Sequence, residues 1–222
     1  MTAKLKKPIK NLLIFGDSHS TFEGFVPEGY KSWYGGEGGT PEKTDVFCVE
    51  DCWWYQLAKE LDLNIVRNDS WSGSTIGFSG YNGEDQSSGK SFIARLEKLE
   101  EKGLFNKTID TVLILGGIND SCANAPLGEV KLDNFVRDDF YFVLPAIGFF
   151  VSKLKTLLPN ANIIFMIHPT LKPEIANAVK VASDFFDIRY FELIDIAKQS
   201  GHPNILGMSQ IKEQIKNFLL EN

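Results

Sequence analysis

Short apolar runs alternate with helical patterns along the chain, and this alternation limits the folds that its 222 residues can adopt. Most of the runs are almost continuously apolar, which is typical of strands that are buried on both faces of a parallel sheet. The runs predict five strands, at about 11–16, 64–68, 111–116, 162–167 and 188–193. The patterns between and after them predict five helices, at about 53–61, 91–102, 145–158, 173–186 and 206–220. Because strands that alternate with helices form right-handed βαβ units, we expect an α/β protein built as a three-layer α/β/α sandwich.

A single domain over residues 1–222 is the expected organisation for a chain of this length. Hydrophobic residues make up 43% and charged residues 23% of the chain, a balance that can build one large core. Three connections, at about 20–52, 70–90 and 120–144, are far longer than the usual βα loops of about 2–6 residues. Ligands of open α/β sheets bind outside the carboxyl ends of the strands, so we expect these loops to form the rim of a site.

The charge balance argues against two classes of partner. Lys and Arg number 23 and Asp and Glu number 29, which gives a formal net charge of −6. An acidic protein is a poor match for nucleic acid or for an anionic membrane surface. No apolar stretch approaches the ~20 residues that are needed to span a bilayer. We therefore expect neither a nucleic-acid nor a membrane partner, and the oligomeric state stays open.

The N-terminal residues and the cysteines also constrain the interpretation. Basic residues precede a short apolar run at 11–15, which imitates the start of a signal peptide but is too short to be one. The sequence as given predicts a cytoplasmic protein, and a periplasmic or secreted one stays open if a leader was removed. Cys48, Cys52 and Cys122 are odd in number and lack the spacing of a zinc site. We expect no metal, no cofactor and no disulfide framework.

Polar residues follow several of the predicted strands, at the edge where a ligand is expected. Ser18 comes just after the first strand, where its hydroxyl and its N–H would be exposed at the rim, although a serine there can also simply cap a turn. Gly73 follows the second strand, and a glycine lets a backbone N–H approach a ligand closely. Asn119 follows the third strand and offers a side-chain donor. His202 follows the fifth strand and could reach Ser18 as a general base.

Four short blocks stand in a fixed order along the chain. They are Gly16-Asp17-Ser18, Gly73, Gly117-x-Asn119-Asp120 and His202. In this order, at these strand ends, the chain resembles the SGNH hydrolase superfamily, also called the GDSL esterase/lipase family. The resemblance extends from Leu12 to about Phe218. Three further stretches resemble a bacterial group of that superfamily: Tyr81-Asn82-Gly83-Glu84-Asp85, Ser91-Phe92-Ile93-Ala94-Arg95 and Ser200-Gly201-His202-Pro203.

The resemblance implies a fold, a reaction and a set of site residues. The fold would be the SGNH hydrolase fold, with a flavodoxin-like sheet of five parallel strands in the order 2-1-3-4-5. Ser18 would be the nucleophile and His202 its base. The oxyanion hole would consist of the N–H of Ser18, the N–H of Gly73 and the side chain of Asn119. The reaction would be ester hydrolysis through an acyl-enzyme.

One position departs from the pattern of the superfamily. The aspartate that usually stands three residues before the histidine is replaced by Gln199. A glutamine can accept a hydrogen bond from the imidazole, but it cannot stabilise an imidazolium with a full charge. We interpret the site as a Ser18–His202 dyad in which Gln199 or a backbone carbonyl orients the ring. A substitute role for Asp195, and a weakened or inactive enzyme, stay open.

Several other residues are candidates for the lining of the site. His168 follows the fourth strand, where we expect a structural or substrate-contacting role, and His19 follows the nucleophile, where it either points sideways or lines the pocket. Trp71 lies in a rim loop and is a further candidate. The aromatic residues of the rim loops are Tyr30, Trp33, Tyr34, Trp71 and Tyr81. Their rings can stack on a sugar or form small cores that stiffen the loops, and we favour the loop cores.

The leading hypothesis is a serine esterase that hydrolyses short acyl esters, acetyl esters first, with carbohydrates as the candidate alcohols. A lipase for long chains is disfavoured because no exposed apolar lid is evident. The first alternative is a carbohydrate-binding protein without activity on the same scaffold, because fold alone does not prove catalysis. The second is a metallophosphoesterase, which the low count of three histidines disfavours.

Overall fold

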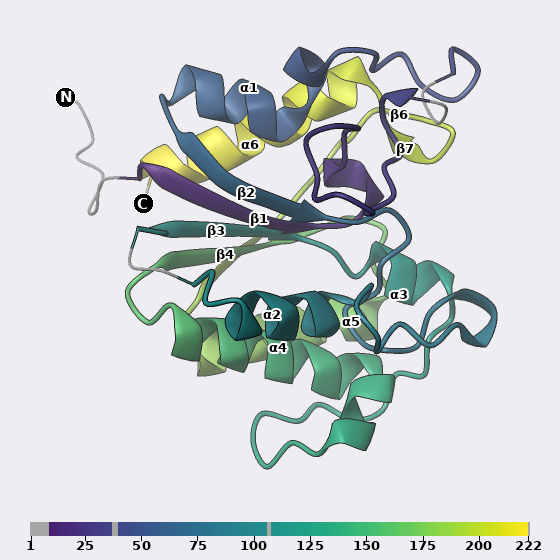
Figure 1. Ribbon diagram of the computed structural model, residues 1–222, viewed down its shortest axis with the longest axis vertical. Coiled ribbons are helices and arrows are strands. Elements are labelled where there is room, and N and C mark those ends of the chain that lie inside the picture. Colours follow the sequence, from purple (N-terminus) through teal and green to yellow (C-terminus); the bar gives the residue numbers. More distant parts are fainter. Residues whose placement is uncertain (1–8, 37–39, 106–107, 222) are drawn as a thin grey trace.

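Five parallel strands form the central sheet of the protein (Figure 1). The computed structural model describes residues 9–36, 40–105 and 108–221, so the basic start of the chain lies largely outside the described residues. The strands are β1 (Asn11–Gly16), β2 (Asn64–Ser70), β3 (Thr111–Leu115), β4 (Asn162–Ile167) and β5 (Arg189–Glu192). Their order is β2-β1-β3-β4-β5, and all neighbours run parallel. The predicted order 2-1-3-4-5 is confirmed.

Helices cover both faces of the sheet, as the alternating pattern predicts (Figure 1). The face shown uppermost carries α1 (Trp53–Glu60) and α6 (Ile205–Glu221). The opposite face carries α2 (Phe92–Glu101), α4 (Val143–Leu157) and α5 (Pro173–Phe185). Local signals fix some helix starts: the hydroxyl of Ser91 caps α2 by accepting from the N–H of Ala94, and Pro173 opens α5 at its first position. The three-layer α/β/α architecture is therefore confirmed.

The apolar runs of β1, β3 and β4 are nearly continuous because these strands are buried on both faces, whereas the edge strands β2 and β5 are partly exposed. Along β1, Leu12 and Ile14 pack with α1 and α6, whereas Leu13 and Phe15 pack with α2 and α4. All four side chains are fully or almost fully buried. This double burial makes the sheet a rigid platform for the segments that leave its carboxyl edge.

The structure contains several short helices and strands that the sequence does not predict. They are the 3-10 helices η1 (Ser18–Ser20), η3 (Val49–Asp51), η4 (Tyr81–Gly83) and η5 (Arg137–Tyr141), the helix α3 (Ile118–Cys122), and the strands β6 (Lys198–Gln199) and β7 (His202–Pro203). Elements of two to five residues are too short to show a hydrophobic period. The predicted strands and long helices occur, with ends that shift by a residue or two.

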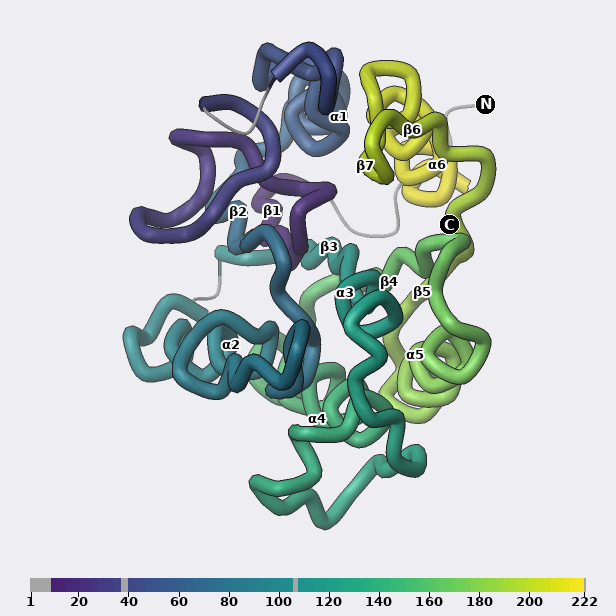
Figure 2. The backbone as a smooth tube through the Cα atoms, turned by 90° about the vertical axis from the view of Figure 1, so that its right-hand side faces the viewer, coloured from purple at the N-terminus to yellow at the C-terminus, as the bar shows by residue number. Residues whose placement is uncertain are grey.

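The segments after the strands meet at the carboxyl edge of the sheet. Figure 2 faces this edge and shows the coil after β1, the loop after β2, the helix α3 and the β6–β7 hairpin around a common centre. The hairpin contacts η1, although the two are far apart in sequence. The topology thus brings residues 18–20 and residues 198–203 to one place.

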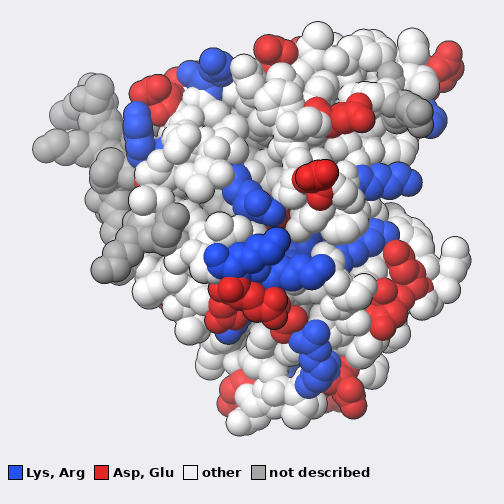
Figure 3. Space-filling model, in the orientation of Figure 1, with Lys and Arg blue, Asp and Glu red and all other residues white. Residues whose placement is uncertain are grey.

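The face shown in Figure 3 carries both positively and negatively charged side chains. Lys and Arg side chains form a band across the middle of this face, with acidic side chains beside it. Among the helices that the structure describes, none combines the length and apolar character required to cross a membrane.

Candidate active site

The sharp turn after β1 presents Ser18 at the edge of the sheet. β1 ends at Gly16, where a Cβ atom would come within 2.5 Å of the Ser70 hydroxyl, so only glycine fits. The carboxylate of Asp17 then caps η1, since its Oδ1 accepts from the N–H of His19 at 3.0 Å. Asp17 therefore holds the turn. This cap fixes the backbone on both sides of Ser18, which is 7% exposed.

His202 meets Ser18 across the site. The Oγ atom of Ser18 and the Nε2 atom of His202 are 2.9 Å apart, although the two residues are separated by 184 positions. The Nδ1 atom of His202 lies 3.1 Å from the carbonyl oxygen of Ser200. A carbonyl only accepts, so Nδ1 carries the ring proton and Nε2 is free to accept from the serine hydroxyl. This is the tautomer that a general base requires.

A tight hairpin places the Ser200 carbonyl against the ring. Ser200 and Gly201 connect β6 to β7 and have φ angles of +48° and +79°, the sign that type I′ turns require at both positions. The structure corrects the assignment of the two side-chain orienters. Gln199 donates instead from Nε2 to the carbonyl of Pro41 at 3.0 Å, and Asp195 is exposed on the surface. The backbone alternative is the one that the structure adopts.

An indole ring covers the imidazole of His202. Trp33 stacks on it with the ring centroids 3.6 Å apart and the planes inclined by 11°. The backbone N–H of Trp33 donates to the hydroxyl of Thr21 at 2.8 Å, which ties this loop to the segment after Ser18. From the sequence, Trp33 is only one of the aromatic residues of the rim, because a sequence does not show that its indole would stack on His202.

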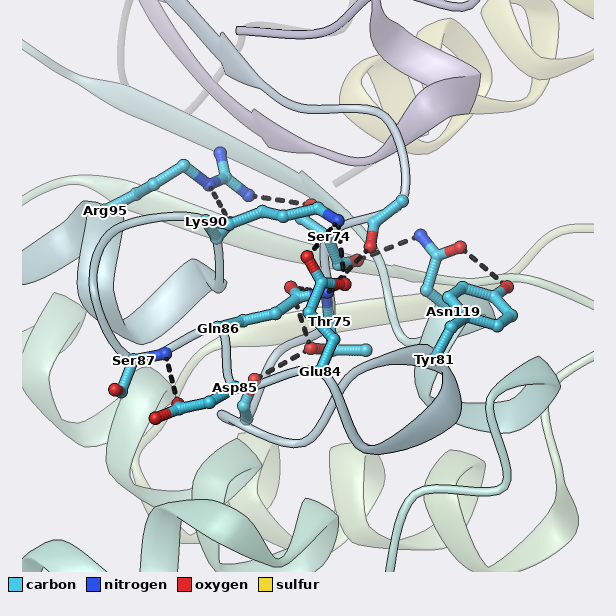
Figure 4. Close-up of polar contacts among 12 residues, drawn as sticks. Ser74, Thr75, Tyr81, Glu84, Asp85, Gln86, Ser87, Lys90, Arg95 and Asn119 are labelled. Carbon is cyan, nitrogen blue, oxygen red and sulfur yellow. Dashed lines mark hydrogen bonds and ion pairs between the residues drawn. The ribbon is translucent and has the colours of Figure 1, made fainter.

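The three expected oxyanion donors lie in segments that follow β1, β2 and β3 at the same edge of the sheet. The N–H groups of Ser18 and Gly73 donate to no acceptor in the described part of the chain. Gly73 has a φ of +78°, which a residue with a side chain rarely adopts. Asn119 lies in the first turn of α3 and donates from Nδ2 to the carbonyl of Ser74 at 2.9 Å, which leaves its second amide hydrogen unassigned (Figure 4).

All three histidines of the chain lie together. The ring of His19 is 5.1 Å from that of His168 and 5.1 Å from that of His202. Burial lowers the pKa of His168 to about 3, and burial followed by the two neighbouring histidines holds the pKa of His19 well below its usual range. Burial also lowers the pKa of His202. The cluster is therefore neutral at pH 7, and His202 is ready to accept a proton.

Two buried acidic groups underlie the site. Burial raises the pKa of Asp17 to about 7, and burial raises the pKa of Asp120 to about 6. Asp120 accepts hydrogen bonds from the N–H groups of Ile76 and Gly77, which joins the loop after β2 to α3. This contact holds the segment that carries Gly73 next to the helix that carries Asn119.

A buried ion pair joins the same loop to the sheet. Arg95 is fully buried and lies 2.8 Å from the carboxylate of Asp69, at the end of β2. Its guanidinium also donates to the carbonyl of Gly16 at 3.2 Å and to the hydroxyl of Ser74 at 3.2 Å. One cation therefore binds the ends of β1 and β2 and the loop beyond them. This role cannot be predicted from the sequence alone, because Arg95 lies on a helix that carries many charged residues.

The remaining lining candidate, Trp71, packs against another rim residue. Its ring stacks on that of Tyr30 with centroids 4.2 Å apart and planes inclined by 25°, and both residues are half-buried. The loop after β1 and the loop after β2 also share a hydrogen bond, from the N–H of Ser72 to the carbonyl of Lys31 at 2.8 Å. These rim aromatics thus stiffen the loops that they belong to.

No group of three or more His, Cys, Asp or Glu side chains within residues 9–36, 40–105 and 108–221 is arranged to hold a metal ion. The polar groups at this edge include the Ser18 hydroxyl, paired with the neutral imidazole of His202, and N–H donors on the segments that follow β1, β2 and β3. That combination fits nucleophilic attack by an activated hydroxyl on a carbonyl whose oxygen becomes negatively charged.

Comparisons with known structures show proteins of the same fold. A GDSL-like lipase from Bacteroides ovatus is 36% identical to the chain, with a TM-score of 0.88, and the match covers 97% of this chain and 100% of that one. A second GDSL-like lipase, from Bacteroides uniformis, is 36% identical with a TM-score of 0.86 and 95% coverage of both chains. An acetyl xylan esterase from the rumen bacterium Butyrivibrio proteoclasticus shares the fold, with a TM-score of 0.62 at 18% identity over 95% of this chain and 63% of that one.

Sequence comparisons identify the same family. A search among curated proteins found no match to the chain. The model of the GDSL-like lipase/acylhydrolase family, in contrast, matches residues 10–219, which include Ser18, Gly73, Asn119 and His202. The match covers nearly the whole chain, and the solved relatives from Bacteroides share its fold over almost their full lengths. The chain belongs to the GDSL-like lipase/acylhydrolase family.

Proposed function

We propose that the protein is a serine esterase that hydrolyses short acyl esters through an acyl-enzyme formed on Ser18. The observation that carries the proposal is the 2.9 Å contact between Oγ of Ser18 and Nε2 of His202 at the carboxyl edge of the sheet. A hydroxyl is a weak nucleophile unless a base within hydrogen-bond reach removes its proton. The neutral tautomer of His202, with its proton on Nδ1, supplies such a base.

In the first half of the reaction, Oγ of Ser18 attacks the ester carbonyl while His202 takes the hydroxyl proton. The carbonyl oxygen becomes an oxyanion, and the N–H groups of Ser18 and Gly73 and the amide of Asn119 are the donors that would stabilise it. Losing one such donor typically raises the barrier by ~3 kcal/mol. His202 then gives its proton to the leaving alcohol, so that the acyl group remains on Ser18.

In the second half, water replaces the alcohol. His202 takes a proton from the water as it attacks the acyl carbonyl, and the same three donors again hold the oxyanion. The tetrahedral intermediate collapses, the acid leaves, and the proton returns to Ser18. Throughout the cycle the Ser200 carbonyl accepts from Nδ1 at 3.1 Å, which keeps the ring in one orientation. A neutral carbonyl stabilises the imidazolium less than a carboxylate would, so we expect a slower base than that of a full triad.

Acetyl groups on carbohydrates are the substrate class that we propose first. The related acetyl xylan esterase shows that this fold can serve such a substrate in another protein. Half-buried aromatic rings at the rim, Tyr30 and Trp71, offer flat apolar surface of the kind that sugar rings contact. The partner would then be a small ester or a carbohydrate ester.

The test compares wild type with Ser18→Ala on p-nitrophenyl acetate and on a panel of acetylated sugars. Wild type should hydrolyse both, and Ser18→Ala should lose about a thousandfold or more in kcat. Ser20→Ala is the matched control, because Ser20 lies in the same turn and its buried hydroxyl has no partner among the described residues. Turnover should persist in a chelator. Wild-type rates in Ser18→Ala would refute the proposal.

A carbohydrate-binding protein without activity is the second candidate. The observation that favours it is the absence of a carboxylate at Nδ1 of His202 within the described chain, where the Ser200 carbonyl stands instead. A sulfonyl fluoride separates the two candidates, because it labels a serine only when a base activates it. In an esterase the reagent should label one serine, Ser18. An inactive binding protein should remain unlabelled and still bind acetylated oligosaccharides.

A further inference from the structure

The amide of Asn119 makes hydrogen bonds at both of its ends (Figure 4). Its Nδ2 donates to the carbonyl of Ser74 at 2.9 Å. Its Oδ1 accepts from the phenol of Tyr81 at 3.0 Å. The carbonyl of Ser74 can only accept, so it requires the nitrogen on its side and sets the orientation of the amide. The oxygen then faces Tyr81, which completes the pair of contacts.

A hydrogen bond donated to Oδ1 of Asn119 changes the strength with which the N–H groups on Nδ2 can donate. Hydrogen bonds in a chain polarise one another, so a proton given to Oδ1 strengthens the N–H groups at the other end as donors. Asn119 is 7% exposed, so its amide is largely shielded from water, although the Tyr81 side chain that donates to it is 38% exposed. The two N–H bonds of the amide point in different directions, one to Ser74 and one free for a ligand.

We propose that Tyr81 is a positioning residue, whose phenol holds and polarises the Asn119 amide so that the free N–H of that amide binds the oxyanion of the reaction. This inference rests on the esterase function proposed above. It gives a role to Tyr81, which the sequence identifies only as a rim aromatic and as the first residue of a stretch that resembles a bacterial group of the superfamily.

The backbone around Tyr81 is built to hold the ring in place. Tyr81 opens η4, and the next residue, Asn82, has a φ of +54°. The N–H of Gly80 donates to the carbonyl of Glu84 at 2.7 Å, and the N–H of Glu84 donates to the carbonyl of Tyr81 at 3.0 Å. These bonds close a tight turn, which fixes the direction in which the Cα–Cβ bond of Tyr81 leaves the backbone.

This turn is also fastened to the loop that carries Gly73 and Ser74. The side chain of Gln86 donates to the carbonyl of Gly73 at 3.0 Å and accepts from the N–H and the hydroxyl of Thr75, each at 3.0 Å (Figure 4). Gln86 is 1% exposed. The segment with Tyr81 and the segment with Ser74 therefore hold opposite ends of the same amide and are themselves bonded together.

The phenol remains a donor under all ordinary conditions. Burial, followed by the neighbouring Cys122 thiol, raises the pKa of Tyr81 to about 12. The hydroxyl therefore keeps its proton across the pH range in which an esterase is assayed. Loss of the donor requires a mutation, and Tyr81→Phe removes the oxygen while keeping the ring.

The test is a double-mutant cycle on p-nitrophenyl acetate with wild type, Tyr81→Phe, Asn119→Ala and the double variant. Tyr81→Phe should lower kcat about tenfold with KM within about twofold, as expected for one lost hydrogen bond. Asn119→Ala should lower kcat about a hundredfold or more. The double variant should be no slower than Asn119→Ala alone, because Tyr81 acts through that amide.

Tyr141→Phe is the matched control. The phenol of Tyr141 contacts Asp85 at 3.3 Å on the same segment, away from the amide. Its loss should leave kcat within about twofold of wild type, since an exposed bond contributes little. If Tyr81→Phe lowers kcat by the same factor in the wild-type and in the Asn119→Ala background, the inference is wrong. A rise in KM at constant kcat would overturn it too, because the phenol would then contact substrate.

A measurement without substrate separates this inference from the proposed function. In heteronuclear NMR, the side-chain amide signals that vanish in Asn119→Ala belong to Asn119. Both proton signals should move upfield in Tyr81→Phe and stay in place in Tyr141→Phe, because a lost donor at Oδ1 weakens the N–H polarisation. Signals that do not move in Tyr81→Phe would overturn the inference, whether or not the protein is an esterase.

Discussion

The carbonyl oxygen of Ser200 lies 3.1 Å from Nδ1 of His202, at the position where a serine-hydrolase triad has a carboxylate. A backbone carbonyl fixes the tautomer of the ring as well as a side chain does, because the hairpin turn leaves it no freedom. It carries no full charge, so it contributes orientation without neutralising the imidazolium. The account therefore predicts a dyad whose geometry depends on the backbone of the β6–β7 hairpin.

Gln199 is the first residue to test on this point. Its amide donates to the carbonyl of Pro41, so Gln199→Ala should leave kcat/KM within about twofold of wild type, and it should cost about 1 kcal/mol of unfolding free energy for the lost bond. Ester hydrolysis and urea denaturation measure the two effects. A tenfold or greater fall in kcat, with the fold intact, would show that Gln199 does orient His202.

The pH dependence of the rate tests the state of the base. His202 must be neutral to accept the proton of Ser18, and burial holds its pKa below 6.5. As pH rises through that folded-state pKa the neutral fraction increases, so kcat/KM should rise along an acid limb below pH 6.5 and then level off. A limb with its midpoint above pH 7 would contradict a neutral, buried base.

Asp17 should make the stability of the protein depend on pH in the opposite sense to most carboxylates. Burial raises the pKa of Asp17 from 3.8 to about 7, so the folded state binds this proton more tightly than the unfolded state. Its contribution to stability is complete below pH 3.8 and is lost as pH rises toward about 7.

Asp17→Asn keeps the acceptor for the N–H of His19 and removes the titration. Relative to wild type, its free energy of unfolding should therefore increase by about 1–4 kcal/mol as the pH is raised over the same interval. Urea denaturation of both proteins at several pH values measures this difference. A difference that stays constant with pH would show that Asp17 does not titrate there.

Arg95 should be essential for the frame beneath the site. Arg95→Met removes the buried cation that holds Asp69, the Gly16 carbonyl and the Ser74 hydroxyl. Asp69 then keeps only its ion pair with the half-buried Arg67, at 2.6 Å, so the unfolding free energy should fall by about 3 kcal/mol. Lys153→Met is the control, because Lys153 forms an exposed pair with Glu100 and should cost at most about 1 kcal/mol. Equal losses in the two variants would contradict the structural role of Arg95.

The sequence predicts the inner strands well because β1, β3 and β4 are buried on both faces, so their apolar runs can be recognised without knowledge of their partners. The encounter of Ser18 with His202 is likewise a consequence of topology, since both follow strands whose carboxyl ends share one edge. The Ser200 carbonyl could not be predicted, because a hairpin of two-residue strands shows no hydrophobic period. The contacts of Tyr81 and Arg95 depend on how distant loops pack, which a single sequence does not specify.

The most direct test of the central claim is to trap the acyl-enzyme. Wild type is acid-quenched during turnover of p-nitrophenyl acetate, and its peptides are analysed by mass spectrometry. The account predicts the added mass of one acetyl group on the peptide that contains Ser18, and none in Ser18→Ala. An acetyl group found on another residue, or turnover with no acyl-enzyme even when deacylation is slowed at low pH, would contradict it.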